Sequence, residues 1–96
     1  MIAYISMNES QKVQLTVITV TWSSAALIEE QILSVQKACK NIRYEQIIVD
    51  NASPDNTVAL IREKHPEVTL IANSENKGFA AANNQGLAVA QGEFLL

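Results

Sequence analysis

The sequence contains a single cysteine, Cys39, among its 96 residues. One cysteine excludes a disulfide within the chain and favours a reducing compartment, so we expect a cytoplasmic protein. Cys39 falls on the apolar face of an expected helix, where a free cysteine acts as a small core hydrophobe. The first ten residues, MIAYISMNES, have no basic region and no long apolar run. We therefore expect neither a signal peptide nor a membrane span, and interpret residues 1–12 as an N-terminal tail.

Three common cofactor signatures are also missing from the sequence. No G-x-G-x-x-G follows the first expected strand, no G-x-x-x-x-G-K-[ST] occurs, and no Cys/His cluster has metal-ligand spacing. These absences argue against nicotinamide and P-loop chemistry. A receiver-like signalling domain would place an acidic pair after its first strand, where this sequence reads Thr-Trp-Ser-Ser, which weakens that alternative.

Positive charge is sparse and scattered. Seven Lys and Arg residues stand against ten Asp and Glu, and the formal net charge is −3. This balance argues against a nucleic-acid partner. Hydrophobic residues make up 48% of the chain, enough for one packed core without metal or disulfide support.

A regular alternation of strand-like and helix-like segments is present. The apolar patterns predict strands at 13–22, 44–50, 67–72 and 92–96, and helices at 25–40, 55–65 and 79–91. Ser23 or Ser24 is expected to cap the first helix, and Ser53-Pro54-Asp55 to begin the second. The order βαβαβαβ predicts a three-layer α/β/α fold with a mostly parallel sheet.

Polar residues follow the expected strands at one edge of this sheet. Because all carboxyl ends of parallel strands lie on the same edge, Thr21-Trp22, Asp50-Asn51 and the 73–78 turn should converge there. Asp50 can accept hydrogen bonds from a ribose hydroxyl or from the N3–H of uracil or thymine, or it can cap its own turn.

Other residues near this edge also have two interpretations. Trp22 can stack on a base, although filling the core is the favoured reading. Lys77 beside Gly78 can meet a diphosphate or be an ordinary surface lysine. Asn83 and Asn84 lie in an apolar helix, so at least one should have a specific partner. His65 is interpreted as a helix-end residue.

Three segments together resemble a known family: TVITVTWSSAALIEEQILSV (16–35), YEQIIVDNASPDNT (44–57) and NKGFAAANNQGLAVAQGEFLL (76–96). In this order and spacing they resemble the N-terminal part of a family 2 glycosyltransferase with the GT-A fold. The resemblance covers about residues 13–96, and its wording is nearest to bacterial rhamnosyltransferase-like enzymes. It implies that 13–96 is the nucleotide-sugar-binding half of a domain that is incomplete at its C-terminus.

The resemblance also implies a donor site. It places Thr21 and Trp22 near the nucleotide base and Asp50 in contact with that base. The remaining residues that it places in the nucleotide pocket, or that adjoin its motifs, are Asn51, Asn76, Lys77, Gly78 and Asn84. An arginine is common in the family where this chain has Asn83. The implied donor is a UDP- or dTDP-sugar, used in inverting transfer to a saccharide or lipid-linked acceptor of a cell-surface polysaccharide.

The family's remaining machinery follows the strand that starts with GEFLL. There an acidic element holds a divalent cation, Mg or Mn, and the acceptor half with its general base comes later. The resemblance therefore implies a cation only in the full-length enzyme, no catalytic residue in this chain, and an inactive 96-residue fragment. A truncated sheet also leads us to expect self-association. Peripheral membrane association of the full-length protein, and a non-catalytic nucleotide-binding or protein-interaction module, stay open as alternatives.

Overall fold

The computed structural model describes residues 3–4, 13–92 and 94–96. Strand β1 at the N-terminus is followed by the predicted order of alternating strands and helices. The elements are β1 (Ala3–Tyr4), β2 (Leu15–Thr21), α1 (Ile28–Ala38), β3 (Tyr44–Asp50), α2 (Thr57–Lys64), β4 (Thr69–Ala72), α3 (Gly78–Val89) and β5 (Phe94–Leu95).

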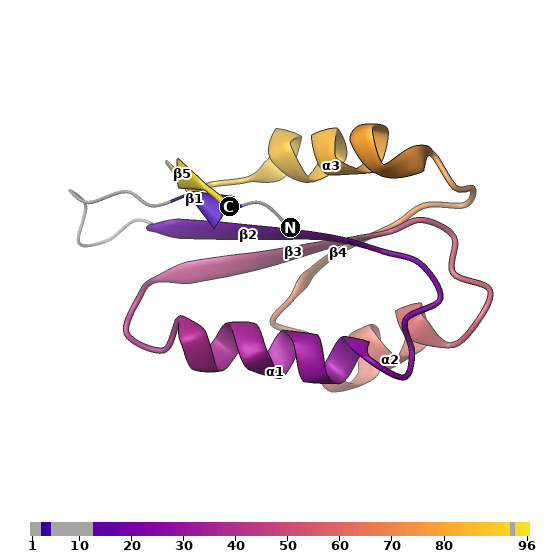
Figure 1. The fold of residues 1–96 in the computed structure, drawn as a ribbon, viewed down its shortest axis with the longest axis horizontal. Coiled ribbons are helices and arrows are strands. Elements are labelled where there is room, and N and C mark those ends of the chain that lie inside the picture. The colour runs from indigo at the N-terminus through magenta and orange to yellow at the C-terminus, as the bar shows by residue number, and fades with distance from the viewer. Residues whose placement is uncertain (1–2, 5–12, 93) are drawn as a thin grey trace.

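The strands form one sheet in the order β1-β5-β2-β3-β4. All neighbours are parallel except β1 and β5, which are antiparallel. Helices α1 and α2 cover one face of the sheet and α3 covers the other, which confirms the three-layer α/β/α prediction (Figure 1). From β2 the chain proceeds to β3 and β4 on one side and then crosses to β5 on the other. The strand order therefore reverses between β2 and β5, and ligands of such sheets bind beyond the carboxyl ends at this reversal.

The two central strands carry most of the core. Under α1 and α2, the buried side chains Ile28, Ile32, Ile48, Ile61 and Val68 pack together. Under α3, Ile18, Ile47, Val49 and Ala82 form a second cluster. A third cluster contains Leu15, Val17, Val35 and Cys39, which confirms Cys39 as a core residue. Side chains buried on both faces explain why β2 and β3 are rich in β-branched residues and why β2 carries no charge.

Glycine sets how closely α3 approaches the sheet. A Cβ atom on Gly86 would lie 2.7 Å from Cγ2 of Ile18, a distance that real side chains do not tolerate. Gly86 therefore lets the helix lie directly against β2, and this holds the start of α3 over the carboxyl edge.

Both helices beneath the sheet begin later than predicted. Helix α1 starts at Ile28 with Leu27 at its N-cap and no side-chain cap, so the prediction of Ser23 or Ser24 as the cap was wrong. The backbone carbonyl of Ser24 instead accepts hydrogen bonds from the N–H groups of Leu27 and Ile28, at 2.9 and 2.8 Å. Helix α2 starts at Thr57, so Ser53 does not cap it and Pro54 lies outside its first turn.

The expected N-terminal tail is described only in part. Ala3 pairs with Leu95 and Tyr4 with Phe94, so these two residues form an edge strand. The other residues of 1–12 lie outside the described part of the chain, and their role as a tail stays a prediction. Within the described ranges, no helix has the length and apolar character needed to cross a membrane.

Candidate functional site

The carboxyl ends of β2, β3 and β4 meet at one edge of the sheet, as the alternation predicted. Thr21 is opposite Asp50, and Asp50 is opposite Ala72. The three loops that leave these strands, after Thr21, Asp50 and Ala72, therefore start side by side. We call this region the carboxyl edge.

Asn51 joins these loops to each other. Its backbone N–H donates to the Thr21 carbonyl at 2.9 Å, and its side-chain Nδ2 donates to the Gly78 carbonyl at 3.0 Å. Its Oδ1 accepts hydrogen bonds from the Lys77 backbone N–H at 3.2 Å and from Asn73 Nδ2 at 3.1 Å. The residue is only 3% exposed. Asn51 therefore holds the start of α3 against the ends of β2 and β3.

A second amide pair, between Asn73 and Gln85, continues from this junction. Asn73 Nδ2 donates to Gln85 Oε1 and Gln85 Nε2 donates to Asn73 Oδ1, both at 2.8 Å. Asn73 was predicted only as the start of the 73–78 turn at this edge, and Gln85 was not predicted to belong to the site. The sequence did offer one signal for Gln85: it is a polar residue within an apolar helix, directly after Asn83 and Asn84. The pair fixes the 73–78 loop to α3.

The 73–78 loop ends in a left-handed residue. Gly78 has φ = 81°, a conformation that favours glycine, and its N–H donates to Asn76 Oδ1 at 2.8 Å. A Cβ at Gly78 would meet no atom within 4 Å, so the space beside its backbone is open. The neighbouring Lys77 side chain is exposed and makes no ion pair with any described residue. The loop therefore offers an open backbone and a cation side by side.

Asp50 is buried and organises its own turn. It is 1% exposed, its Oδ2 accepts from the Ser53 N–H at 2.8 Å, and its Oδ1 accepts from the Ser53 hydroxyl at 2.5 Å. The structure thus shows the turn-capping alternative. An ionised carboxylate has about four acceptor positions, so two bonds leave further acceptor capacity. The predicted contact between Asp50 and a base stays a prediction.

The loops after β2 and β3 are also linked to each other. The Ser53 hydroxyl oxygen accepts from the Ser23 N–H at 2.8 Å. The Asp55 carboxylate accepts from the Ala25 N–H at 3.2 Å and from the Thr57 hydroxyl at 2.5 Å. The Ser53 hydroxyl, which was expected to cap α2, is thus engaged between the loops. The hydroxyls of Ser23 and Ser24, which were expected to cap α1, donate instead to Asp55 Oδ2 at 3.4 Å and to the Trp22 carbonyl at 3.1 Å.

Asp55 is the charged centre of this link. The hydrogen bond from the Thr57 hydroxyl lowers the pKa of its carboxyl group most strongly. Desolvation opposes this effect, and bonds from Ala25, the Thr57 backbone and Ser23 lower the pKa further. Ser23 and Ala52 have φ values of 53° and 65°, in the left-handed region that non-glycine residues seldom adopt. The linked loops therefore hold a backbone shape that the local sequence alone does not favour.

Trp22 corrects a prediction. The favoured reading placed it in the core, but its side chain is 54% exposed at the end of β2. The preceding Thr21 is 5% exposed, so burial ends abruptly between the two residues. Trp22 therefore presents a large exposed aromatic surface beside the carboxyl edge, and stacking on a nucleotide base stays a prediction for it.

The asparagines of α3 do not behave as expected. Asn84 is exposed, and Asn83 has a buried Oδ1 with no hydrogen-bond partner within the described ranges. The expectation that at least one has a specific partner is therefore not met there. The helix instead directs Gln85 toward Asn73.

The chain's own acids do not form a cation site. Among the residues that the structure describes, no group of three or more His, Cys, Asp or Glu side chains is arranged to hold a metal ion. At the carboxyl edge, both Asp50 and Asp55 are engaged by neighbouring serine or threonine groups. A divalent cation at this edge would need oxygen ligands beyond these two carboxylates.

The architecture and its carboxyl edge are those of the nucleotide-binding half of a GT-A glycosyltransferase. Residues 16–96 match the family described as Glycosyl transferase family 2, and the chain belongs to this family.

Three similar proteins illustrate the relationship. The succinoglycan biosynthesis protein ExoO of Rhizobium meliloti (strain 1021) is 33% identical over 81 residues, covering 83% of this chain and 23% of ExoO. The dolichol-phosphate mannosyltransferase of Pyrococcus furiosus is 30% identical over 83 residues, covering 83% of this chain and 23% of that protein. The mannosyltransferase PcManGT from Pyrobaculum calidifontis, solved in complex with GDP-Man and Mn2+, superposes with a TM-score of 0.70 at 36% identity. That match covers 81% of this chain and 24% of PcManGT, so the chain spans about a quarter of the length of these relatives.

Proposed function

We propose that the carboxyl edge binds the nucleoside diphosphate of a sugar donor, and that the protein to which this chain contributes transfers the sugar to an acceptor. The observation that carries the proposal is the junction at Asn51, which joins the ends of β2 and β3 to the open backbone at Gly78. Family membership and the nucleotide-sugar complex of PcManGT support it. Lys77 and the backbone beside Gly78 are the groups that we assign to the diphosphate.

We further propose a UDP- or dTDP-sugar as the donor. Asp50 offers only acceptors, and the N3–H of uracil or thymine is a matching donor. Guanine also carries N–H donors, and PcManGT was solved with GDP-Man. GDP is therefore the competitor that an experiment must include. The succinoglycan role in the name of ExoO supports a polysaccharide acceptor, whether saccharide or lipid-linked, and rhamnose stays a proposal for the transferred sugar.

The Asp50 assignment is tested by separating base contact from turn capping. UDP, dTDP and GDP are titrated calorimetrically into the 96-residue chain and into the Asp50→Ala and Ser53→Ala variants. Loss of a buried polar partner weakens binding by about 1–3 kcal/mol, so Asp50→Ala should lose that much for its preferred nucleotide. Ser53→Ala removes the hydroxyl that donates to Asp50 Oδ1 but keeps the Asp50 carboxylate. This variant should bind the nucleotide nearly as well as the unchanged chain.

Three outcomes count against the proposal. Equal losses in both variants would mean that Asp50 acts only through its turn. Unchanged affinity in Asp50→Ala would remove Asp50 from the site. A preference for GDP over UDP and dTDP would overturn the pyrimidine assignment but leave the nucleotide site standing.

A further inference from the structure

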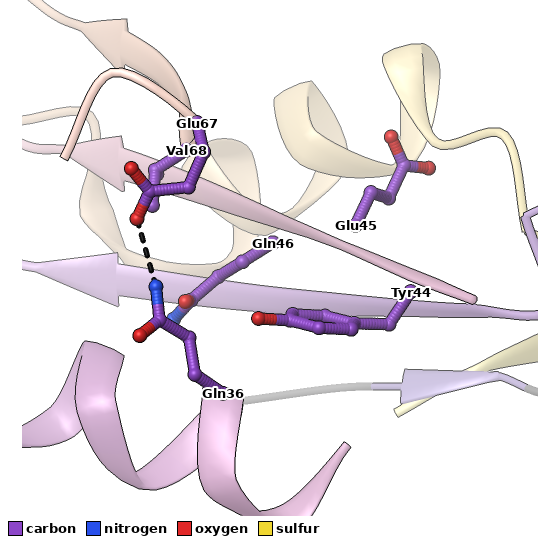
Figure 2. Close-up of a pocket in the computed structure, with 6 residues that line it drawn as sticks. All are labelled: Gln36, Tyr44, Glu45, Gln46, Glu67 and Val68. Carbon is purple, nitrogen blue, oxygen red and sulfur yellow. Dashed lines mark hydrogen bonds between the residues drawn. The ribbon is translucent and has the colours of Figure 1, made fainter. Parts of the chain in front are cut away.

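A pocket lies away from the carboxyl edge, at the other end of β3. It has a volume of about 180 Å³ and is lined by Gln36 of α1, Tyr44, Glu45 and Gln46 of β3, and Glu67 and Val68 before β4 (Figure 2). Gln46 precedes Asp50 by four residues on the same strand, a separation of about 13 Å along β3. The pocket therefore belongs to the amino half of the sheet, beneath the α1 face, and is distinct from the proposed nucleotide site.

Gln46 is the unusual residue of this pocket. Its side chain is on a buried face of β3, and the residue is only 4% exposed. Within the described part of the chain, neither its Oε1 nor its Nε2 has a hydrogen-bond partner. A buried amide without partners is destabilising, and native proteins seldom leave both of its groups unpaired. A ligand that accepts a hydrogen bond from Gln46 Nε2 and donates one to Gln46 Oε1 would satisfy both groups.

The other polar groups around the pocket are nearly all neutral or already paired. Burial raises the pKa of the Tyr44 phenol, and Cys39 and Glu67 nearby raise it further, so the hydroxyl stays protonated. Gln36 Nε2 donates to Glu67 Oε2 at 2.8 Å. Figure 2 shows the Tyr44 hydroxyl and the Gln36 amide both directed toward the side chain of Gln46.

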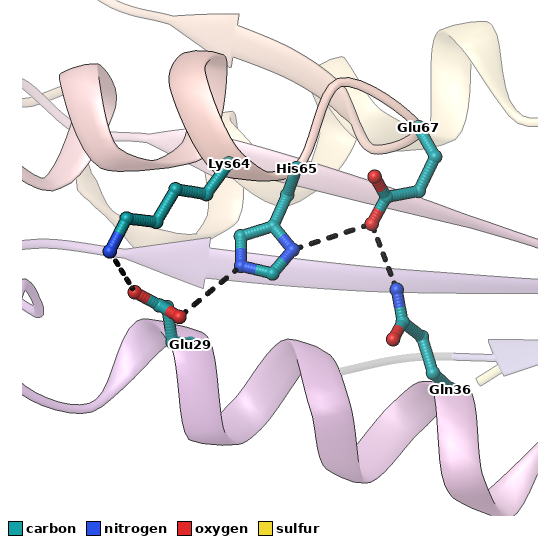
Figure 3. A network of polar contacts seen from close by, with 5 residues as sticks. All are labelled: Glu29, Gln36, Lys64, His65 and Glu67. Carbon is teal, nitrogen blue, oxygen red and sulfur yellow. Dashed lines mark hydrogen bonds and ion pairs between the residues drawn. The ribbon is translucent and has the colours of Figure 1, made fainter.

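The two acids at the pocket are both held by other groups. Glu67 Oε2 also lies 3.4 Å from Nδ1 of His65. The other ring nitrogen of His65, Nε2, lies 3.8 Å from Oε2 of Glu29 on α1 (Figure 3). Glu45 points to the opposite face of the sheet, where it accepts from the Thr16 hydroxyl at 2.7 Å. One engaged carboxylate is a poor ligand set for a divalent cation, which prefers several oxygen ligands. The negative charge of Glu67 also disfavours an anionic ligand.

The chemistry that remains is that of hydroxyl groups. A hydroxyl donates and accepts at once, so two neighbouring hydroxyls can satisfy both atoms of the Gln46 amide. The ring of Tyr44 supplies an apolar surface for C–H groups. A cavity of about 150 Å³ in another protein admits benzene, so about 180 Å³ has room for one six-membered ring, with the outer hydroxyls of a sugar extending beyond the pocket. We infer that the pocket between α1, β3 and β4 binds a small neutral polyol the size of one sugar ring.

The test follows the side-chain NH₂ signals of Gln46 by ¹⁵N NMR while D-glucose or D-mannose is added to the 96-residue chain. We expect a saturable shift of the Gln46 signals. Gln46→Leu should weaken binding at least about tenfold, because the leucine cannot pair with hydroxyls. Gln31→Leu is the matched control, since Gln31 lies on α1 outside the lining of this pocket, and it should bind as the unchanged chain does.

The remaining outcomes decide against the inference. Gln46 signals that do not move up to about molar sugar would mean that the pocket holds only water. Equal binding by Gln46→Leu would place the sugar elsewhere. Should Gln46→Leu fail to fold, the shift of Gln46 in the unchanged chain and its loss in Tyr44→Phe still decide the question.

Discussion

The side-chain amide of Asn51 donates a 3.0 Å hydrogen bond to the backbone carbonyl of Gly78, 27 residues later in the sequence. This bond connects the residue that follows β3 to the first residue of α3. Because Asn51 also accepts from the Lys77 N–H, it holds both residues that we assign to a donor diphosphate. The shape of the proposed site thus depends on one buried asparagine.

Replacing Asn51 with alanine should lower the free energy of unfolding by about 1–3 kcal/mol, since the Lys77 N–H and Gly78 carbonyl lose a buried partner. Urea denaturation measures the change. Asn41→Ala, at an exposed position between α1 and β3, is the control and should change stability little. Equal effects of the two substitutions would contradict the role given to Asn51.

Trp22 is the only tryptophan, so its fluorescence reports on the carboxyl edge alone. Trp22→Ala should change the free energy of unfolding by less than about 0.5 kcal/mol, because more than half of the side chain is exposed. Bound UDP or dTDP should quench the emission of the unchanged chain by stacking, and the alanine variant should bind about 1–3 kcal/mol more weakly. Phe79→Ala, which removes a second exposed aromatic (60% exposed), is the control. Nucleotide binding without quenching would exclude stacking on Trp22.

Asp55 should make stability depend on pH in the acidic range. Its pKa is lowered in the folded chain, so the ionised carboxylate stabilises the fold at pH values above about 4. That contribution is lost as the pH falls through the lowered pKa. Thermal unfolding of Asp55→Asn and of the unchanged chain should therefore differ most near neutral pH and converge in acid. Glu63→Gln, an exposed acid on α2, is the control; a difference for Asp55→Asn that is constant with pH would refute the assignment.

The 96-residue chain should self-associate, by pairing of sheet edges or by exchange of the C-terminal strand between two copies. On β2, only Leu15 and Thr16 pair with β5, so within the described residues Ile18 to Thr21 pair on one side only, with β3. Unpaired strand edges recruit further strands. Sedimentation across micromolar concentrations should show association, and removal of residues 94–96 should weaken it. A monomer of about 10.5 kDa at every concentration would show that this edge stays unpaired.

The 96-residue chain should not transfer sugar by itself. Inverting transfer needs a general base for the acceptor and a means of stabilising the departing diphosphate, and the two acids at the carboxyl edge are engaged within their loops. The check is the release of UDP or dTDP from its sugar donor with a saccharide acceptor present. Release above the buffer rate would contradict the prediction.

The sequence by itself determined the order of the elements from β2 to β5 and the edge of the sheet at which the polar loops meet. β3 spans Tyr44–Asp50, the predicted range, because an apolar run ended by a charged residue marks a strand buried on both faces. Parallel topology then brings the ends of β2, β3 and β4 to one edge whatever the details of packing. The match of residues 16–96 to the family agrees with the motifs at that edge.

Only the tertiary structure decided which polar groups meet there. The sequence could not show whether Trp22 is covered, since a tryptophan at a strand end is buried only when another element packs over it. The Asn73–Gln85 pair joins a loop to helix α3, and the bond between Ser23 and Ser53 joins two loops; no local pattern encodes such contacts. For the same reason the orphan amide of Gln46 was invisible in the sequence: the glutamine lies within a predicted strand, and its unpaired atoms emerge only when α1 and β4 close around it.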